Sequence, residues 1–167
     1  DGRWATRVAT TGNPYTTRMV VVRPRDAARF NGTVVVEWLN VSFGVDIPVD
    51  FSQSYEHFIR EGYAYVGVTT QKAGADKLEN LDPARYAAVN LGGDALSYDV
   101  FSQAAQAIRA NPQLLGGRTP AVVLGTGHSQ SALRLVTYAN AIQPRARIFD
   151  GFLIHGRSTG AAEITGG

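Results

Sequence analysis

Residues 127–131 (GHSQS) constrain the fold of this chain more than any other segment. They follow the apolar run 121–124 (AVVL) and precede residues 132–139 (ALRLVTYA), which have a helical pattern. A serine between small residues, on a sharp turn from a strand into a helix, is the arrangement called a nucleophile elbow. The turn raises the serine hydroxyl above the sheet and places the N–H of Gln130 beside any oxyanion that forms there. The motif therefore predicts a serine hydrolase in which Ser129 is the nucleophile.

The composition is that of a globular protein without a nucleic-acid surface. A chain of 167 residues suits one domain and is long enough to bury a core. Its 44% hydrophobic and 18% charged residues argue against disorder. The net charge is only +2 and the basic residues are scattered, so no nucleic-acid partner is expected. We expect residues 1–167 to form a single domain.

The residue types present also limit the chemistry. The chain has no cysteine, which excludes a disulfide scaffold, a thiolate nucleophile and a cysteine metal site. No His-Glu-x-x-His spacing occurs, so neither a metal nor another cofactor is expected. No apolar run approaches the ~18 residues of a membrane span. The chain starts at Asp1 without a methionine, which together with the lack of cysteine favours a secreted or periplasmic protein.

Hydrophobic periodicity predicts strands that alternate with helices. Strands are expected at residues 15–24, 33–39, 63–69, 121–124 and 148–154, and helices at 51–62, 94–110 and 130–142. Such an order predicts a mostly parallel sheet with helices on both faces. The pair Asn31-Gly32 is a hairpin signal, so the first two strands are expected to pair antiparallel. Asp94 is expected to cap its helix, Pro144 to end the last one, and residues 71–93 to form a long functional loop.

Several segments resemble one bacterial family of α/β-hydrolases, whose members are described as "alpha/beta hydrolase domain" proteins. These segments are 29–33 (RFNGT), 36–42 (VEWLNVS), 62–68 (GYAYVGV), 97–104 (SYDVFSQA), 127–131 (GHSQS) and 149–152 (FDGF). The resemblance covers most of residues 15–157. It implies the α/β-hydrolase fold with a serine nucleophile at Ser129, and it implies no particular substrate. Ser131 stands where hydrolases of this fold most often have glycine, but the family resembles the chain at this position too.

Acyl transfer needs two N–H donors for the oxyanion in addition to the nucleophile. The first is assigned to Gln130. In this fold the second comes from the loop after an earlier strand, here the one that ends at Leu39. We assign it to Val41, with Asn40 as the alternative. Asn40, His128 and His155 are expected to line the pocket.

The histidine and the acid of a catalytic triad are not evident in this chain. In this fold they follow the serine along the sequence, which leaves only Asp150, His155 and Glu163. Asp150 and His155 lie near opposite ends of one predicted strand, about 16 Å apart at ~3.3 Å per residue, too far to pair. We therefore predict the N-terminal portion of an α/β-hydrolase, whose last strands are absent. The remaining C-terminal part, as a second chain or outside these residues, would carry both groups.

Other interpretations remain open from the sequence. Ser129 would also fit an ordinary serine at a helix N-terminus. Glu37, an acid within an apolar strand, is expected to have a structural hydrogen-bond partner rather than a catalytic role. A dinucleotide site is disfavoured, because the third glycine of that motif is replaced by Gln130. The favoured substrate is a small carboxylic ester. Amidase, thioesterase or lactonase chemistry, or an inactive hydrolase fold that binds a ligand, are the alternatives.

Overall fold

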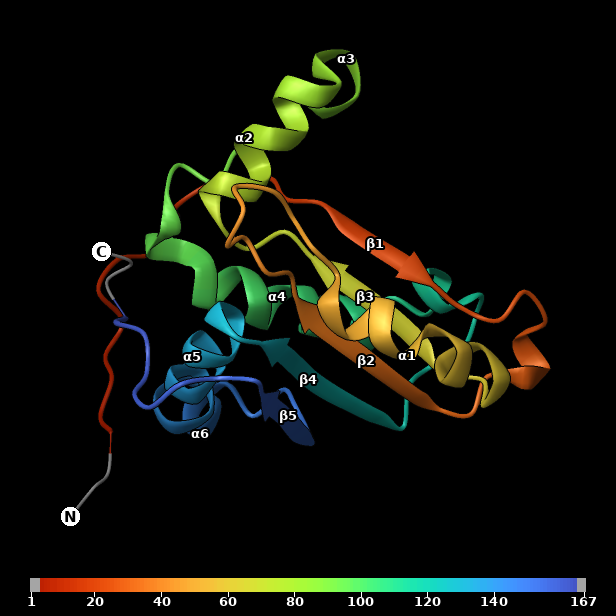
Figure 1. Ribbon diagram of the computed structural model, residues 1–167. Helices are drawn as coiled ribbons and strands as arrows, with labels where there is room; N and C mark the ends of the chain where they lie inside the picture. The colour runs from red at the N-terminus through yellow and green to blue at the C-terminus, as the bar shows by residue number, and fades with distance from the viewer. Residues whose placement is uncertain (1–3, 165–167) are drawn as a thin grey trace.

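The computed structural model describes residues 4–164 as a mixed sheet flanked by helices (Figure 1). Asp1 and Gly167, the first and last residues, lie outside the described part. The strands are β1 (Met19–Val22), β2 (Thr33–Trp38), β3 (Ala64–Val68), β4 (Val122–His128) and β5 (Gly151–His155). Their order in the sheet is β1-β3-β2-β4-β5. The last four run parallel and β1 is antiparallel to β3, so the mostly parallel sheet of the prediction is confirmed.

The predicted hairpin between the first two strands is wrong. β1 pairs with β3, and β2 lies between β3 and β4. β2 is buried at five of its six positions, and such an apolar strand is stabilised at the centre of a sheet. The turn that contains Asn31 contacts the segment before β3 instead, since the N–H of Asn31 donates to the Gly62 carbonyl at 2.9 Å. Asn31-Gly32 therefore does form a turn, but the two strands that it connects are not neighbours in the sheet.

Helices cover both faces of the sheet. They are α1 (Val49–Arg60), α2 (Lys72–Leu81), α3 (Pro83–Tyr86), α4 (Ser97–Ala110), α5 (Gln130–Thr137) and α6 (Gln143–Ala146). Short 3-10 turns occupy Ala27–Arg29, Asp94–Leu96 and Pro112–Leu115, and a π turn occupies Tyr138–Ile142. Neighbouring residues of a strand point to opposite faces. Glu37 of β2 contacts the start of α1, whereas Trp38 packs on Phe101 of α4, so α1 and α4 lie on opposite faces.

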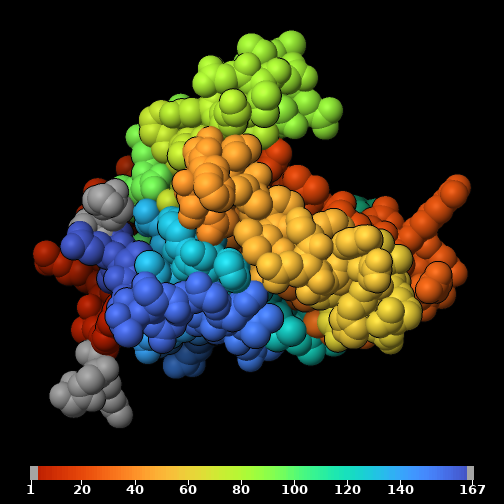
Figure 2. All heavy atoms as spheres, viewed as in Figure 1, coloured from red at the N-terminus to blue at the C-terminus, as the bar shows by residue number. Residues whose placement is uncertain are grey.

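Most of the segment 71–93 is helical, since α2 and α3 occupy residues 72–81 and 83–86, and this corrects the prediction of a long loop. α2 buries Ala75 and Leu78 one turn apart, and Asp82 caps α3 with Pro83 in its first turn. The apolar face of α2 is small, which explains why its periodicity gave little signal. Both helices project from the rest of the molecule (Figures 1 and 2).

Two predicted helix boundaries are also wrong. Pro144 does not end a helix, because the chain passes from α5 through the π turn into α6 and Pro144 lies in the first turn of α6. Proline is tolerated there because its fixed φ is compatible with a helix. Asp94 does not cap α4. It begins a 3-10 turn, and its carboxylate accepts a hydrogen bond from the N–H of Lys72, the first residue of α2.

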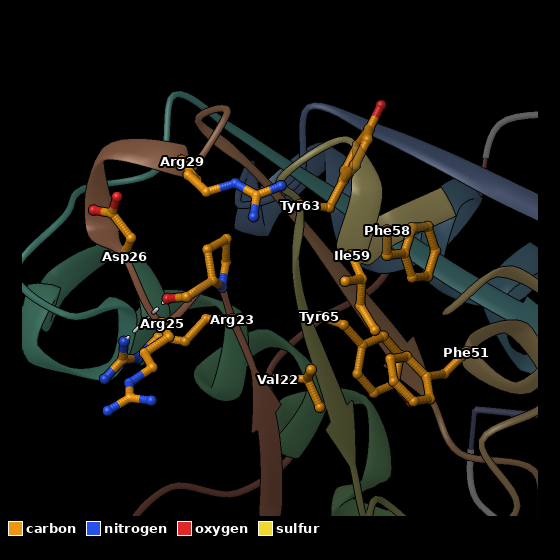
Figure 3. Close-up of a pocket in the computed structure, with 11 residues that line it drawn as sticks. Val22, Arg23, Arg25, Asp26, Arg29, Phe51, Phe58, Ile59, Tyr63 and Tyr65 are labelled. Atoms are coloured by element: carbon orange, nitrogen blue, oxygen red, sulfur yellow. Dashed lines mark hydrogen bonds between the residues drawn. The ribbon is translucent and has the colours of Figure 1, made fainter. Parts of the chain in front are cut away.

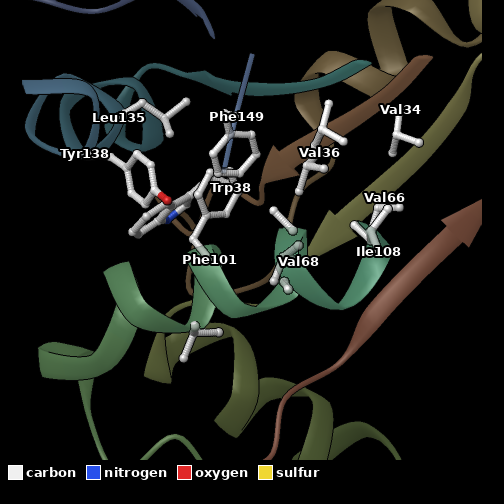
Figure 4. Packing of buried hydrophobic residues seen from close by; sticks show 14 of the residues in the cluster. Val34, Val36, Trp38, Val66, Val68, Phe101, Ile108, Leu135, Tyr138 and Phe149 are labelled. Atoms are coloured by element: carbon white, nitrogen blue, oxygen red, sulfur yellow. The ribbon is translucent and has the colours of Figure 1, made fainter. Parts of the chain in front are cut away.

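The core lies between the sheet and the helices α4 and α5 (Figure 4). Strand residues Val34, Val36, Trp38, Val66 and Val68 meet Phe101 and Ile108 of α4, together with Leu135, Tyr138 and Phe149. Aromatic rings pack on one another within it: Phe101 is stacked on Phe149 with centroids 4.9 Å apart and lies edge-to-face with Tyr138 at 5.5 Å. Within residues 4–164 no helix is long and apolar enough to cross a membrane.

Candidate active site

Ser129 occupies the junction between β4 and α5 in a backbone conformation that L-residues rarely adopt. Its φ is 58° and its ψ is −114°. Such conformations cost on the order of 1–3 kcal/mol and persist only when the surroundings enforce them. Two hydrogen bonds do so here: the Ser129 N–H donates to the His155 carbonyl at 3.2 Å, and its carbonyl accepts from the N–H of Leu133 at 3.2 Å. The turn is therefore strained and held from both sides.

The residues two positions before and after Ser129 must be small for this turn to form. A Cβ added to Gly127 would lie 2.9 Å from Leu135 and 3.1 Å from the Ser131 Cβ. Ser131 is itself completely buried between β4 and α5. The close approach of strand and helix thus explains the small residues of the motif.

The loop after β2 lies against the same turn. The buried Asn40 donates from its side-chain amide to the His128 carbonyl at 2.9 Å and accepts from the Ser42 N–H at 2.9 Å. Its backbone pairs with Ile47 in both directions, at 3.1 and 2.9 Å. Asn40 therefore joins this loop to the residue just before Ser129, and the half-buried Val41 follows it directly.

His128 and His155 are neighbours at the carboxyl ends of β4 and β5. They are paired in register, and their rings lie 5.0 Å apart. His155 Nε2 forms a 2.5 Å contact with Asp50 Oδ1, and Asp50 Oδ2 accepts from the hydroxyl of Thr126 at 2.8 Å. Asp50 thus connects the start of α1 to two strands beside Ser129. Sequence reasoning missed this buried residue, whose only signal was an acid at the start of a predicted helix.

Glu37 has the structural hydrogen bonds that its place in an apolar strand predicted. It is 1% exposed and accepts from the N–H groups of Asp50 and Phe51, at 2.9 and 3.1 Å. The hydroxyl of Tyr65 donates to it at 2.7 Å. Burial, together with a smaller effect of the nearby Asp50 charge, raises the pKa of Glu37 from 4.5 to about 7 and outweighs these three donors. Glu37 therefore holds the start of α1 on the sheet.

This raised pKa predicts a pH-dependent stability. The folded protein binds more protons at Glu37 than the unfolded chain between pH 4.5 and about 7, so the stability that Glu37 contributes falls as the pH rises through this window. The fall amounts to about 3 kcal/mol. Urea unfolding at pH 4.5 and 7.5 should show this difference between wild type and Glu37→Gln, because glutamine does not titrate. If the free energies of unfolding of the two proteins differed by the same amount at both pH values, the raised pKa of Glu37 would be contradicted.

Asp150 and His155 are not paired, as the strand-length argument predicted. Asp150 lies at the other end of the sheet, where it accepts from Arg109 at 2.6 Å and from the Val123 N–H at 2.7 Å. The hydrogen bond from the Val123 N–H and the charge of Arg109 lower the pKa of Asp150. Glu163 is exposed, and so is His57 on α1. Among residues 4–164 no group of three or more metal-binding side chains occurs.

A pocket of about 560 Å³ lies away from Ser129 (Figure 3). It is bounded by the end of β1 and the segment after it, the start of β3, and one side of α1. Its lining residues are Val22, Arg23, Pro24, Arg25, Asp26, Arg29, Phe51, Phe58, Ile59, Tyr63 and Tyr65. The pocket lies beside the amino end of β3, whereas Ser129 lies at the carboxyl end of β4. This pocket is therefore separate from the candidate active site.

Comparison with known proteins identifies the family. The model of the family described as "Alpha/beta hydrolase domain" matches residues 1–167, and the chain belongs to this family. No curated protein matches the chain. Among solved structures, the thermophilic esterase Est2 of the planctomycete Thermogutta terrifontis is similar in its propionate-bound form, with 14% identity and a TM-score of 0.42. The butyrate-bound form gives 16% identity and 0.39. The match covers 70% of this chain but only 38% and 37% of the esterase chains.

Proposed function

We propose that this chain supplies the nucleophile and the oxyanion donors of a serine hydrolase that cleaves carboxylic esters. The observation that carries the proposal is the conformation of Ser129, which stands with positive φ at a strand–helix junction in a member of the α/β-hydrolase family. Strained, non-glycine residues held by their surroundings cluster at functional sites. A serine in this place has its hydroxyl at the edge of the sheet where substrate binds.

The reaction would proceed through an acyl-enzyme. Ser129 Oγ attacks the ester carbonyl and gives its proton to a histidine, forming a tetrahedral oxyanion. The oxyanion accepts hydrogen bonds from the N–H groups of Gln130 and Val41, and the positive end of α5 stabilises its charge. Collapse breaks the bond to the alkoxide, which takes the proton from the histidine and leaves as the alcohol. Water then attacks the acyl-enzyme and releases the acid.

We assign the catalytic histidine and its acid to polypeptide outside residues 1–167. Within the described residues His155 is paired with Asp50. The hydroxyl of Thr126 donates a hydrogen bond to the other oxygen of that carboxylate, on the α1 side of the sheet. This arrangement fits a role in holding α1 to β4 and β5. Asn40, His128 and His155 would form the wall of the substrate pocket next to Ser129.

The bond that is cleaved can be tested with matched substrates on the full-length protein. As an esterase, the protein is expected to hydrolyse p-nitrophenyl butyrate faster than the butyryl thioester of thiophenol and far faster than butyryl p-nitroanilide, whose anilide is a poorer leaving group than p-nitrophenolate. Initial rates at equal substrate concentration give the comparison. If the thioester or the anilide were cleaved faster, the proposed activity would be that of a thioesterase or an amidase instead of an esterase. No cleavage of any of the three would favour a ligand-binding protein.

A further inference from the structure

Gln71 has a buried side-chain amide, and both its oxygen and its nitrogen form hydrogen bonds. It lies between β3 and α2 and is 3% exposed. Its Oε1 accepts from Trp38 Nε1 at 3.1 Å and from Gln130 Nε2 at 3.0 Å. Its Nε2 donates to Asp94 Oδ2 at 3.1 Å. Rotating the amide by half a turn would place its NH₂ group against the Trp38 N–H and its oxygen against the Asp94 carboxylate, so the orientation of Gln71 is fixed.

Asp94 connects this amide to α5 a second time. Its Oδ2 also accepts from Arg134 at 3.1 Å, and its Oδ1 accepts from the Lys72 N–H at 2.7 Å. Gln130 and Arg134 are four residues apart on α5, so they lie on the same face of the helix. The first turn of α5 is therefore bound at both ends to one Gln71–Asp94 unit. Arg134 is buried as well, which shields these bonds from water.

This unit contacts the residue that matters most for oxyanion binding. Gln130 follows Ser129 directly, and its backbone N–H is the proposed donor. The strained conformation of Ser129 would relax if the first turn of α5 were free to shift. A donor must lie 2.7–3.1 Å from the oxyanion, and a displacement of about 1 Å costs on the order of 100-fold in rate. Fixing the side chain of Gln130 therefore also fixes the direction of its N–H.

We infer that Gln71 is a positioning residue for the oxyanion site: through the side chain of Gln130, and with Asp94 as its anchor, it holds the Gln130 N–H at the start of α5. This role rests on the proposed function. It predicts that loss of the Gln71 amide weakens binding of the transition state far more than binding of the substrate. A residue that only stabilised the fold would lower the melting temperature without this selectivity.

The test uses Gln71→Met in the full-length protein, with Gln143→Met as the matched control. Gln143 is a half-buried glutamine on α6 whose side chain makes two hydrogen bonds, both to Phe149 and none to Gln130. For Gln71→Met we expect kcat for p-nitrophenyl butyrate to fall about 10- to 100-fold with KM changed less than about threefold. The affinity for an alkyl trifluoromethyl ketone, which forms an oxyanion adduct with serine, should fall by the same factor as kcat. Gln143→Met should leave both values within about twofold.

A second variant keeps the inference testable if Gln71→Met folds poorly. Gln130→Met removes the same hydrogen bond from the other side and leaves the backbone N–H intact. Its effect on ketone affinity should equal that of Gln71→Met, and the double variant should be no worse than either. Additive effects, or unchanged ketone affinity in a folded Gln71→Met protein, would overturn the inference while leaving the esterase intact. A wild-type protein that neither cleaves the ester nor binds the ketone would overturn the proposed function itself.

Discussion

Replacing Ser129 by alanine is expected to reduce kcat/KM for p-nitrophenyl butyrate by about 10⁴- to 10⁶-fold in the full-length protein. The reason is that the proposed acyl-enzyme cannot form without the Ser129 hydroxyl, whereas the proposed oxyanion donors, the N–H groups of Gln130 and Val41, stay in place. Alanine keeps the Cβ and adds no atom to the tight turn. The free energy of unfolding should therefore change by less than about 1 kcal/mol, so the loss would not reflect misfolding.

The matched control for this variant lies two residues away. Ser131 belongs to the same motif, but it is completely buried and its hydroxyl bonds to the His128 carbonyl at 3.3 Å. Ser131→Ala should therefore retain activity within a few-fold. Ser129→Ala with more than about a tenth of wild-type turnover, measured after the protein is freed of contaminating esterases, would place the nucleophile elsewhere.

The largest effect on stability is expected for Trp38→Ala, at about 3–5 kcal/mol. Trp38 is 0% exposed at the end of β2, and its ring packs on Tyr98 and Phe101 of α4 with centroids 5.4 and 5.1 Å away. Its removal leaves a large cavity between β2 and α4. It also removes the Nε1–H donor to Gln71. Urea unfolding followed by far-UV circular dichroism measures the loss.

The other tryptophan of the chain provides the control. Trp4 is 45% exposed, so Trp4→Ala should change the free energy of unfolding by less than about 0.5 kcal/mol. A cost below about 1 kcal/mol for Trp38→Ala would mean that the core between the sheet and α4 is not packed as described.

Local patterns predicted the parts of this fold that depend on local chemistry. The β-branched run 33–39 and the run 63–69 appear as β2 and β3, and the apolar spacing of 94–110 appears as α4. The pairing between strands was harder to predict from the sequence. The Asn31-Gly32 signal indicated a turn correctly but not its partner, because β2 is drawn to the centre of the sheet by its burial on both faces.

In the candidate site, too, local patterns identified some residues and missed those that are defined by distant contacts. Ser129, Gln130 and Asn40 were accessible to sequence reasoning because a short motif and its neighbouring loop define them. Asp50 was not, since its partner His155 lies 105 positions away in the sequence. Gln71 was not either, because a lone glutamine carries no pattern. Its role emerges only when β2, α5 and the turn at Asp94 are brought together by the sheet.

Mass spectrometry after reaction with a fluorophosphonate tests the central claim most directly. The reagent phosphonylates an activated serine and leaves an ordinary serine unmodified. In the full-length wild-type protein we expect one adduct per molecule, located on the peptide that contains Ser129, and no adduct in Ser129→Ala. A folded wild-type protein without an adduct, or one modified at another residue, would contradict the assignment of Ser129 as the nucleophile.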